Sequence, residues 1–382
     1  MRAFVFTDEA LAKHAGQFVW LSIDTEKKQN ADFSRKYPIR AWPSMYVIDP
    51  ETETIVLRWV GGATVGQLDK LFVQGEQAAR RGGGGSAEAL AKADALYGAG
   101  KYGESIPAYR EALGKISPKS PDYARVTEAL LFSLQVEKQY PDCVAAVRAA
   151  TPNLHASASA ANLAATGLDC AMSMPKEAPG RNAAIAEFEP RVQTMVADAR
   201  LPLAADDRSA MYSLLVDARD EAGDKAGAKK VANEWVAYLD GVAAGLTDPE
   251  QRTALDPNRL GAYQAADEVA KAIPMLEQSQ RDFPRDYNPP ARLAIVYLKL
   301  KRYDEALAAS DRALELVYGP RRIRVLEVRA DIYAARGDTA AQRRTLQEAV
   351  AFADELPAGQ RSDSQVASLK KKLDATVAGG SP

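Results

Sequence analysis

Two cysteines and two histidines are the side chains most suited to nucleophilic or metal chemistry in this sequence. Cys143 and Cys170 form neither a CxxC pair nor a metal-ligand spacing. Two interpretations of them stay open: small buried side chains on helices, or a disulfide between neighbouring helices. His14 and His155 join no Cys/His cluster, so we expect no metal site, no cofactor and no Ser/His/Asp or Cys/His catalytic group.

Two glycine motifs raise the question of nucleotide binding. A GxGxxG pattern at 98–103 would need a preceding strand and a following helix N-terminus, but it falls at a predicted helix–helix turn. Gly61 and Gly66 have the spacing of a phosphate loop, yet the lysine and hydroxyl residue that should follow are absent. Neither motif predicts a nucleotide site.

Length and charge narrow the class of protein. The chain has 382 residues, enough for two or three domains, and a formal net charge of -2. This charge provides no general attraction for nucleic acid or anionic membrane. No apolar run is long enough to span a bilayer, and the N-terminus carries no export signal. As written, the sequence is therefore that of a cytoplasmic protein.

A glycine-rich stretch, RRGGGGS at 80–86, separates two unlike parts. Successive glycines favour a flexible linker, which we place at 81–86. Residues 1–80 alternate between strand and helix patterns, whereas 87–382 read almost entirely as helix. The expected fold is α/β followed by an all-α domain.

The first part has the pattern of a small α/β domain. Two near-continuous apolar runs predict buried strands at 18–24 and 44–50, and β-branched and aromatic residues predict a third at 54–62. Residues 29–37 read as a short helix that ends at a proline. Residues 63–81 form an amphipathic helix, with an apolar stripe at Val65, Leu68, Leu71 and Phe72.

The segments FVWLSIDTE, KYPIRAWPSMYVIDP and LRWVGGAT resemble the C-terminal two-thirds of the thioredoxin fold. The resemblance implies a cis-proline at Pro43, with Trp42 and Pro43 forming a surface that contacts an extended peptide. X–Pro bonds adopt the cis form at a cost of only about 0.5–1 kcal/mol. The alternative is a trans proline at the first residue of a strand.

The resemblance also implies that the redox CxxC helix and a central strand precede Met1. We expect the natural chain to begin upstream, where an export signal and a periplasmic location would also be encoded. The alternative is a truncated relic without redox function. Without the central strand, two strand edges and an apolar face would lack partners.

The helical part contains an internal repeat. AGKYGESIPAYREAL at 99–113 and KLKRYDEALAASDRAL at 299–314 share a turn, a tyrosine, an acidic residue and a closing Ala-Leu. This residue pattern resembles the tetratricopeptide repeat, which is about 34 residues long. The chain thus resembles bacterial thioredoxin-family proteins that carry such repeats. Further copies, looser in the middle of the chain, lie at 130–152, 156–196, 212–235, 261–284 and 323–350.

About seven helix pairs would stack into an α-solenoid with a groove for protein segments. The family lines this groove with the first helix of each pair. In the last copies, this rule selects Asn288, Lys299, Arg324, Glu327 and Asp331. The alternative for each of them is a solvated helix face.

Two functions of different classes follow. The first is a scaffold that binds protein or peptide partners through the repeats, with a redox-inactive thioredoxin-like remnant. The second is a thiol–disulfide oxidoreductase or redox chaperone whose CxxC lies upstream and whose repeats select substrates. The sequence does not predict the oligomeric state or the identity of the partner.

Overall fold

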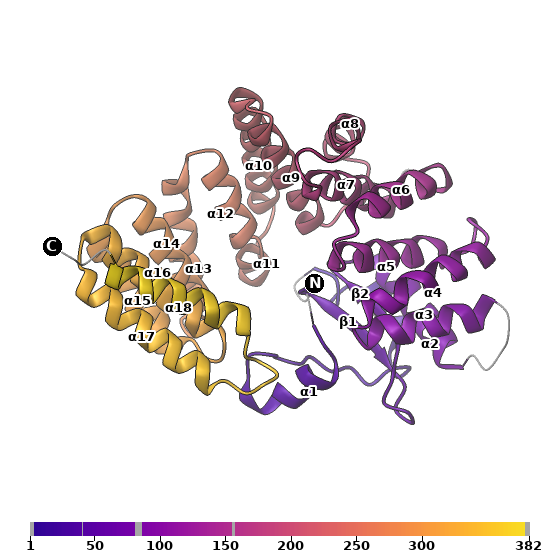
Figure 1. Cartoon of the computed structure of the whole chain (residues 1–382), viewed down its shortest axis with the longest axis horizontal. Helices are drawn as coiled ribbons and strands as arrows, with labels where there is room; N and C mark the ends of the chain where they lie inside the picture. The colour runs from indigo at the N-terminus through magenta and orange to yellow at the C-terminus, as the bar shows by residue number, and fades with distance from the viewer. Residues whose placement is uncertain (1–3, 40, 81–85, 155–156, 379–382) are drawn as a thin grey trace. The chain divides into compact units, whose positions relative to one another are not determined.

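The computed structural model describes residues 4–39, 41–80, 86–154 and 157–378, which form two compact units (Figure 1). The first unit comprises the described residues up to Val19 and Tyr37–Tyr238. The second comprises Trp20–Lys36 and the described residues from Leu239 onward. The predicted linker at 81–86 lies outside the described residues except for its last position, so a domain boundary there stays a prediction.

The first unit opens with a short 3-10 helix, η1 (Glu9–His14), and a β-hairpin. Strand β1 (Ser44–Ile48) pairs antiparallel with β2 (Ile55–Val60), and the register shifts at Val47/Ile48. Helix α2 (Val65–Arg80) follows and packs against β2. The two later predicted strands and the amphipathic helix are confirmed, although β1 is only half-buried.

The hairpin, η1 and α2 share one hydrophobic core. From α2, Leu68, Leu71 and Phe72 are buried, as the predicted stripe requires, and Val65 is partly buried at its edge. Strand β2 adds inward-facing side chains and the N-terminal segment completes the cluster: Leu57, Trp59, Ala63, Val5 and Leu11. The period of two in the strand and of about 3.6 in the helix brings these residues to one side.

The predicted strand at 18–24 is wrong. These residues have no regular structure, and Val19 and Leu21 are 88% and 73% exposed. A strand is stable only when a neighbour accepts its backbone hydrogen bonds, and no described strand lies beside this segment. The sheet in the described part of the chain therefore has two strands, which does not establish a thioredoxin fold.

The Trp42–Pro43 peptide bond is cis, as the thioredoxin resemblance implied, and the trans alternative is wrong. Trp42 is 61% exposed. The Pro43 carbonyl accepts a hydrogen bond from the Gly61 N–H at 2.9 Å. That carbonyl therefore extends the hairpin ladder and is not free for an extended peptide.

The rest of the first unit is built of helices, most of which pack as consecutive antiparallel pairs: α3 with α4, α5 with α6, and α7 with α8. Helix α10 begins in this unit and ends in the second. Their bounds are α3 (Ser86–Gly98), α4 (Tyr102–Lys115), α5 (Tyr123–Val136), α6 (Tyr140–Ala150), η3 (Thr151–Asn153), α7 (Ala158–Ser173), α8 (Arg181–Ala197), α9 (Ala205–Glu221) and α10 (Lys225–Ala244).

Helix α3 packs directly on the hairpin. A Cβ added at Gly98 would lie 2.7 Å from Cβ of Ile55, so only glycine allows this approach. The buried Arg58 guanidinium lies 5.1–5.6 Å from the ring centroids of Tyr46, Tyr97 and Tyr102. Cation–π contacts of this kind bind the hairpin to the first helix pair.

Cys143 of α6 and Cys170 of α7 form a disulfide, and both side chains are fully buried. Of the two interpretations that the sequence left open, the covalent one is correct. The bond joins neighbouring helix pairs, because α6 closes one pair and α7 opens the next.

The second unit continues the helix pairs, with α14 against α15 and α16 against α17, and ends with α18 packed on α17. The apolar core of its last repeats includes Leu326, Leu346 and Leu369. Its elements are η2 (Lys28–Asn30), α1 (Ala31–Lys36), α11 (Pro249–Ala254), α12 (Asp256–Ala265), η4 (Val269–Lys271), α13 (Ala272–Asp282), α14 (Asn288–Lys299), α15 (Tyr303–Leu316), α16 (Arg321–Arg336), α17 (Thr339–Glu355) and α18 (Asp363–Ala378).

The segment 20–36 lies against the turns of these last repeats. Glu26 accepts hydrogen bonds from Arg321 Nε at 2.5 Å and from the Tyr287 hydroxyl at 3.2 Å. Asp24 accepts one from the Tyr318 hydroxyl at 2.6 Å. These polar contacts hold a turn of the chain itself. The predicted helix at 29–37 is confirmed as α1.

No helix in the described ranges has the length and apolar character needed to cross a membrane.

Candidate functional site

One face of each of three helices in the first unit is lined by polar and aromatic side chains. On α5 this face carries Glu128, Phe132 and Gln135, spaced by four and three residues as a single helical stripe requires. Helices α7 and α9 repeat the arrangement, with Asn162, Thr166 and Asp169 on α7 and Asp207, Met211, Leu214 and Asp217 on α9. Each of these helices is the first of its predicted pair.

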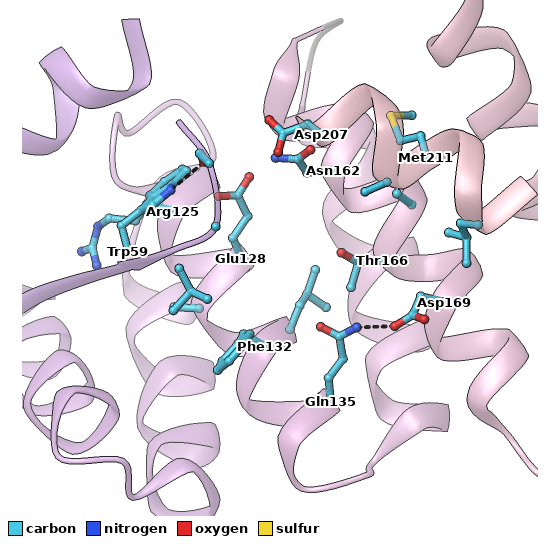
Figure 2. Close-up of a pocket in the computed structure, with 18 of the residues that line it drawn as sticks. Trp59, Arg125, Glu128, Phe132, Gln135, Asn162, Thr166, Asp169, Asp207 and Met211 are labelled. Carbon is cyan, nitrogen blue, oxygen red and sulfur yellow. Dashed lines mark hydrogen bonds between the residues drawn. The ribbon is translucent and has the colours of Figure 1, made fainter. Parts of the chain in front are cut away.

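These three faces and the end of the hairpin enclose a cavity of about 480 Å³, here called the acidic cavity. Figure 2 shows Glu128, Thr166 and Asp169 projecting from facing helices into the space bordered by Trp59 and Phe132. Trp59 is held in place because its indole N–H donates to the Gly62 carbonyl at 2.9 Å. The turn after β2 therefore forms one wall.

The two arginines that line the cavity are already bound inside the chain. Arg125 donates to both carboxylate oxygens of Asp94, at 2.8 and 3.0 Å, and the Tyr109 hydroxyl donates to the same carboxylate. Arg58 donates to the Tyr102 hydroxyl at 2.8 Å. Asp94 compensates the charge of Arg125. Arg58 forms no ion pair among the described residues, and its Nε and Nη2 donate no hydrogen bond there.

The four carboxylates that line the cavity are not compensated in this way. No lysine or arginine within the described ranges forms an ion pair with Glu128, Asp169, Asp207 or Asp217. Asp169 accepts a hydrogen bond from Gln135 Nε2 at 2.7 Å, which orients the carboxylate without neutralising it (Figure 2). The site is therefore electrostatically negative.

The pKa values of these carboxylates reflect their surroundings. The pKa of Glu128 is raised to about 7, chiefly by burial and to a lesser extent by the Asp207 carboxylate, against a hydrogen bond from Ser159 and the charge of Arg125. Burial, with repulsion from Asp206, raises the pKa of Asp207 to about 6. Burial also raises the pKa of Asp169. In all three, burial is the largest cause, and it disfavours the charged form of the carboxylate.

The residues predicted from the thioredoxin resemblance lie at the entrance to the hairpin. Trp42 and Pro43 are both exposed and directly precede β1. Neither lines the acidic cavity. Their role in peptide contact stays a prediction.

The residues predicted from the last repeats separate into two places. Asn288 and Lys299 stand at opposite ends of α14, and Asn288 donates to Asp286 at 2.8 Å. Arg324, Glu327 and Asp331 share α16, where Glu327 is buried and pairs with Lys372 of α18 at 2.8 Å. Burial raises the pKa of Asp331, and Lys372 opposes that shift.

No site residue predicted from the sequence lines the acidic cavity. A usable signal is present, because 132 and 135 lie in the first helix of the pair predicted at 130–152, and 125 and 128 continue the same helical period before it. The predicted groove residues come from the last copies, where the repeat is regular. In the looser copies the helix boundaries were too uncertain to assign a face.

Comparison with known families matches residues 287–355 to the tetratricopeptide repeat. The match spans α14 to α17, so the repeat predicted at 299–314 and 323–350 is confirmed for this segment. No curated protein matches the sequence.

Three solved structures are similar to the chain. A tetratricopeptide repeat protein from Parabacteroides merdae is 10% identical, with 76% of this chain and 98% of that chain covered and a TM-score of 0.47. The yeast Sti1 TPR2AB domain, in a complex with pHSP90, is 15% identical over 76% and 98%, with a TM-score of 0.30. The assembly chaperone of RpL4, Acl4, is 13% identical over 78% and 99%, with a TM-score of 0.34. All three scores are below 0.5.

Proposed function

We propose that the protein is a scaffold that holds a segment of a protein partner on the first helices of its repeats. The repeat match at 287–355 supports this class of function, because stacked helix pairs present extended surfaces for binding. The single observation that carries the proposal is the acidic cavity. It combines aromatic walls with convergent polar groups from three successive repeats, as binding sites do.

A photo-crosslinking experiment on the full chain tests the proposal. Thr166 lines the acidic cavity on α7, and Thr194 is exposed on α8, so the two threonines form a matched pair. Each is replaced in turn by benzoyl-phenylalanine in cells, and adducts are identified by mass spectrometry. We expect defined protein adducts from position 166 and none of the same adducts from position 194.

Two results of this experiment would reject the proposal. If position 166 captures nothing, or if both positions capture the same proteins, the cavity does not hold a partner segment. Thermal unfolding of both variants before irradiation excludes misfolding as the reason for a negative result.

We further propose that the hairpin and α2 are a redox-inactive thioredoxin-like remnant. The order of strand, strand and helix supports this, together with the proline at the entrance of β1. In this proposal Trp42 and Pro43 form a second, smaller contact surface. Substitution of Trp42 with alanine should weaken the binding of a partner that spans both surfaces, as measured by pull-down. The α-helical content, measured by circular dichroism, should stay unchanged.

The described chain should not catalyse thiol–disulfide exchange. Its two cysteines are joined to each other, and neither side chain is exposed, so no thiolate can attack a substrate disulfide. We expect no turnover in an insulin-reduction assay. Turnover that depends on added thiol and disappears in Cys143→Ser would favour the oxidoreductase instead.

A further inference from the structure

We propose that the acidic cavity binds a lysine or arginine side chain of the partner segment, with Glu128 and Asp207 as the principal anionic contacts. This inference rests on the proposed scaffold function and specifies the chemistry of its ligand. It is supported by unpartnered buried atoms, the sign of the charge, the apolar walls and the size of the cavity.

The cavity contains carboxylate oxygen atoms that lack hydrogen-bond partners. One carboxylate oxygen of Glu128, Oε1, and one of Asp207, Oδ2, are shielded from solvent and accept no hydrogen bond from any residue that the structure describes. Both residues line the cavity, from helices α5 and α9. A buried carboxylate oxygen without a donor is unfavourable, so a cationic donor placed between these helices would stabilise both.

The charge of the acidic cavity is negative. The two lining arginines are engaged by Asp94 and by the tyrosines around β2, whereas the four carboxylates have no cationic partner within the described ranges. Four unpaired carboxylates outnumber the one lining arginine without an ion pair, Arg58, so phosphate groups or an acidic peptide would be disfavoured. A metal ion is a poor candidate, because no group of three or more His, Cys, Asp or Glu side chains in the described part of the chain could hold one.

The remaining walls of the acidic cavity suit a long aliphatic side chain. Trp59, Phe132, Met211 and Leu214 line the same cavity. Lysine and arginine lay their methylene groups along apolar surface and extend the charged head toward polar groups. Trp59 and Phe132 also offer aromatic faces to a cation. An acidic cavity with such walls fits a basic side chain better than a hydrated ion.

The volume of the acidic cavity is typical of a ligand-binding pocket. A volume of about 480 Å³ falls within the range of roughly 300–1,000 Å³ that is usual for ligand pockets. It accommodates a side chain together with the flanking backbone. The Gln135 carboxamide and the Thr166 hydroxyl, which also line the cavity, can pair with the backbone of the bound segment.

The experiment uses fluorescent peptides of one length and sequence in which a central residue is lysine, arginine, norleucine or glutamate. Norleucine keeps the aliphatic stem of lysine and removes its charge. Binding to the full chain is measured by fluorescence anisotropy at low and high salt. We expect saturable binding of the lysine and arginine peptides, weakened by salt, and at least about tenfold weaker binding of the norleucine peptide.

Three variants of the protein locate the effect. Glu128→Gln and Asp207→Asn keep the shape of each side chain and remove its charge, whereas Glu177→Gln removes the same charge from an exposed turn. We expect Glu128→Gln and Asp207→Asn each to weaken binding of the lysine peptide by about tenfold. Glu177→Gln should change that affinity by less than about twofold. Glu128→Gln removes a desolvated charge and should therefore not destabilise the fold. Thermal unfolding of the variant checks this.

The proposal is overturned if the lysine and arginine peptides show no saturable binding up to about 1 mM, a limit that corresponds to very weak affinity. It is also overturned if norleucine binds as well as lysine, or if Glu177→Gln weakens binding as much as Glu128→Gln. Spermidine serves as a competitor: tighter binding of this free polyamine than of the lysine peptide would assign the cavity to a small amine instead. Capture of partners at position 166 with any of these results would leave the scaffold function standing and reject only this inference.

Discussion

The acidic cavity and the last two repeats use the same helical framework in opposite ways. On α15 and α16, Arg329 bonds to Ser310 at 2.7 Å and to Asp311 at 2.5 Å, and Arg336 pairs with Asp304 at 2.7 Å. In the acidic cavity, Glu128 and Asp207 keep oxygen atoms without a partner among the described residues. The two arginines of the regular repeats are paired with carboxylates, whereas one carboxylate oxygen each of Glu128 and Asp207 is not paired.

This difference separates side chains that stabilise helix packing from side chains that do not. The segment that matches the tetratricopeptide repeat, 287–355, has side chains that stabilise neighbouring helices. The first unit encloses the cavity with the perturbed carboxylates. Groups that are unfavourable for stability persist at functional sites because binding requires them.

The largest effect is expected from the buried pair behind the cavity. Asp94→Ala leaves the Arg125 guanidinium buried without its carboxylate, because both side chains are at most 5% exposed. The expected loss is about 3–5 kcal/mol of unfolding free energy, measured by urea denaturation. Asp311→Ala, which breaks the exposed pair with Arg329 in the regular repeats, should lose only about 0.2–1 kcal/mol. Equal losses would show that the two regions do not differ.

The disulfide should stabilise the first unit selectively. The double substitution Cys143→Ala and Cys170→Ala opens a loop with a sequence separation of 27 and should lower stability by about 3 kcal/mol. Both cysteines lie in the first unit, so hydrogen exchange should rise in α5 to α8 and stay unchanged in α14 to α17. Two free thiols in the denatured, unreduced protein would contradict the bond itself.

Two glutamates should respond to the same substitution with opposite signs. Between pH 4.5 and about 7, folded Glu128 holds a proton that the unfolded chain has released, so the stability of the protein falls as the pH rises through this window. Arg125, Asp207 and Ser159 are the groups that act on it. Glu128→Gln stays neutral and should be more stable than the parent at pH 8, by on the order of 2 kcal/mol.

Glu327 provides the matched comparison for that substitution. Its carboxylate pairs with Lys372, so Glu327→Gln should lower stability by about 1 kcal/mol or less. Thermal and urea unfolding at pH 5 and pH 8 measure both variants. Loss of stability in Glu128→Gln at pH 8 would show that the cavity carboxylate is already compensated.

The smallest effect distinguishes a tight helix contact from an open one. A Cβ at Gly167 would lie 2.9 Å from the ring of the buried Phe188, so Gly167→Ala should lower stability by about 1–2 kcal/mol through overpacking. Gly114→Ala meets no atom within 4 Å and should raise stability by about 0.5–1 kcal/mol. Denaturant midpoints of the two variants should therefore shift in opposite directions. A stabilised Gly167→Ala would mean that α7 and α8 pack loosely.

The sequence alone was sufficient for features that depend on neighbours along the chain. The helical period predicted the apolar stripe of α2, and the repeated Tyr, acidic and Ala-Leu pattern predicted helix pairs in the last repeats. Spacing within one helix also held the information for the face of Glu128, Phe132 and Gln135, although the looser repeats hid it. These signals survive because helix geometry relates residues only three or four positions apart.

Tertiary structure alone decided which segments meet. The apolar run at 18–24 is not a strand because no described strand accepts its hydrogen bonds, a fact that no local pattern encodes. Cys143 and Cys170 pair because α6 lies beside α7, and Glu128 becomes a desolvated carboxylate only because α5, α7 and α9 enclose it with the turn after β2. Burial, pairing and electrostatic coupling depend on distances in space, and residues far apart in the sequence acquire those distances only when the helices stack.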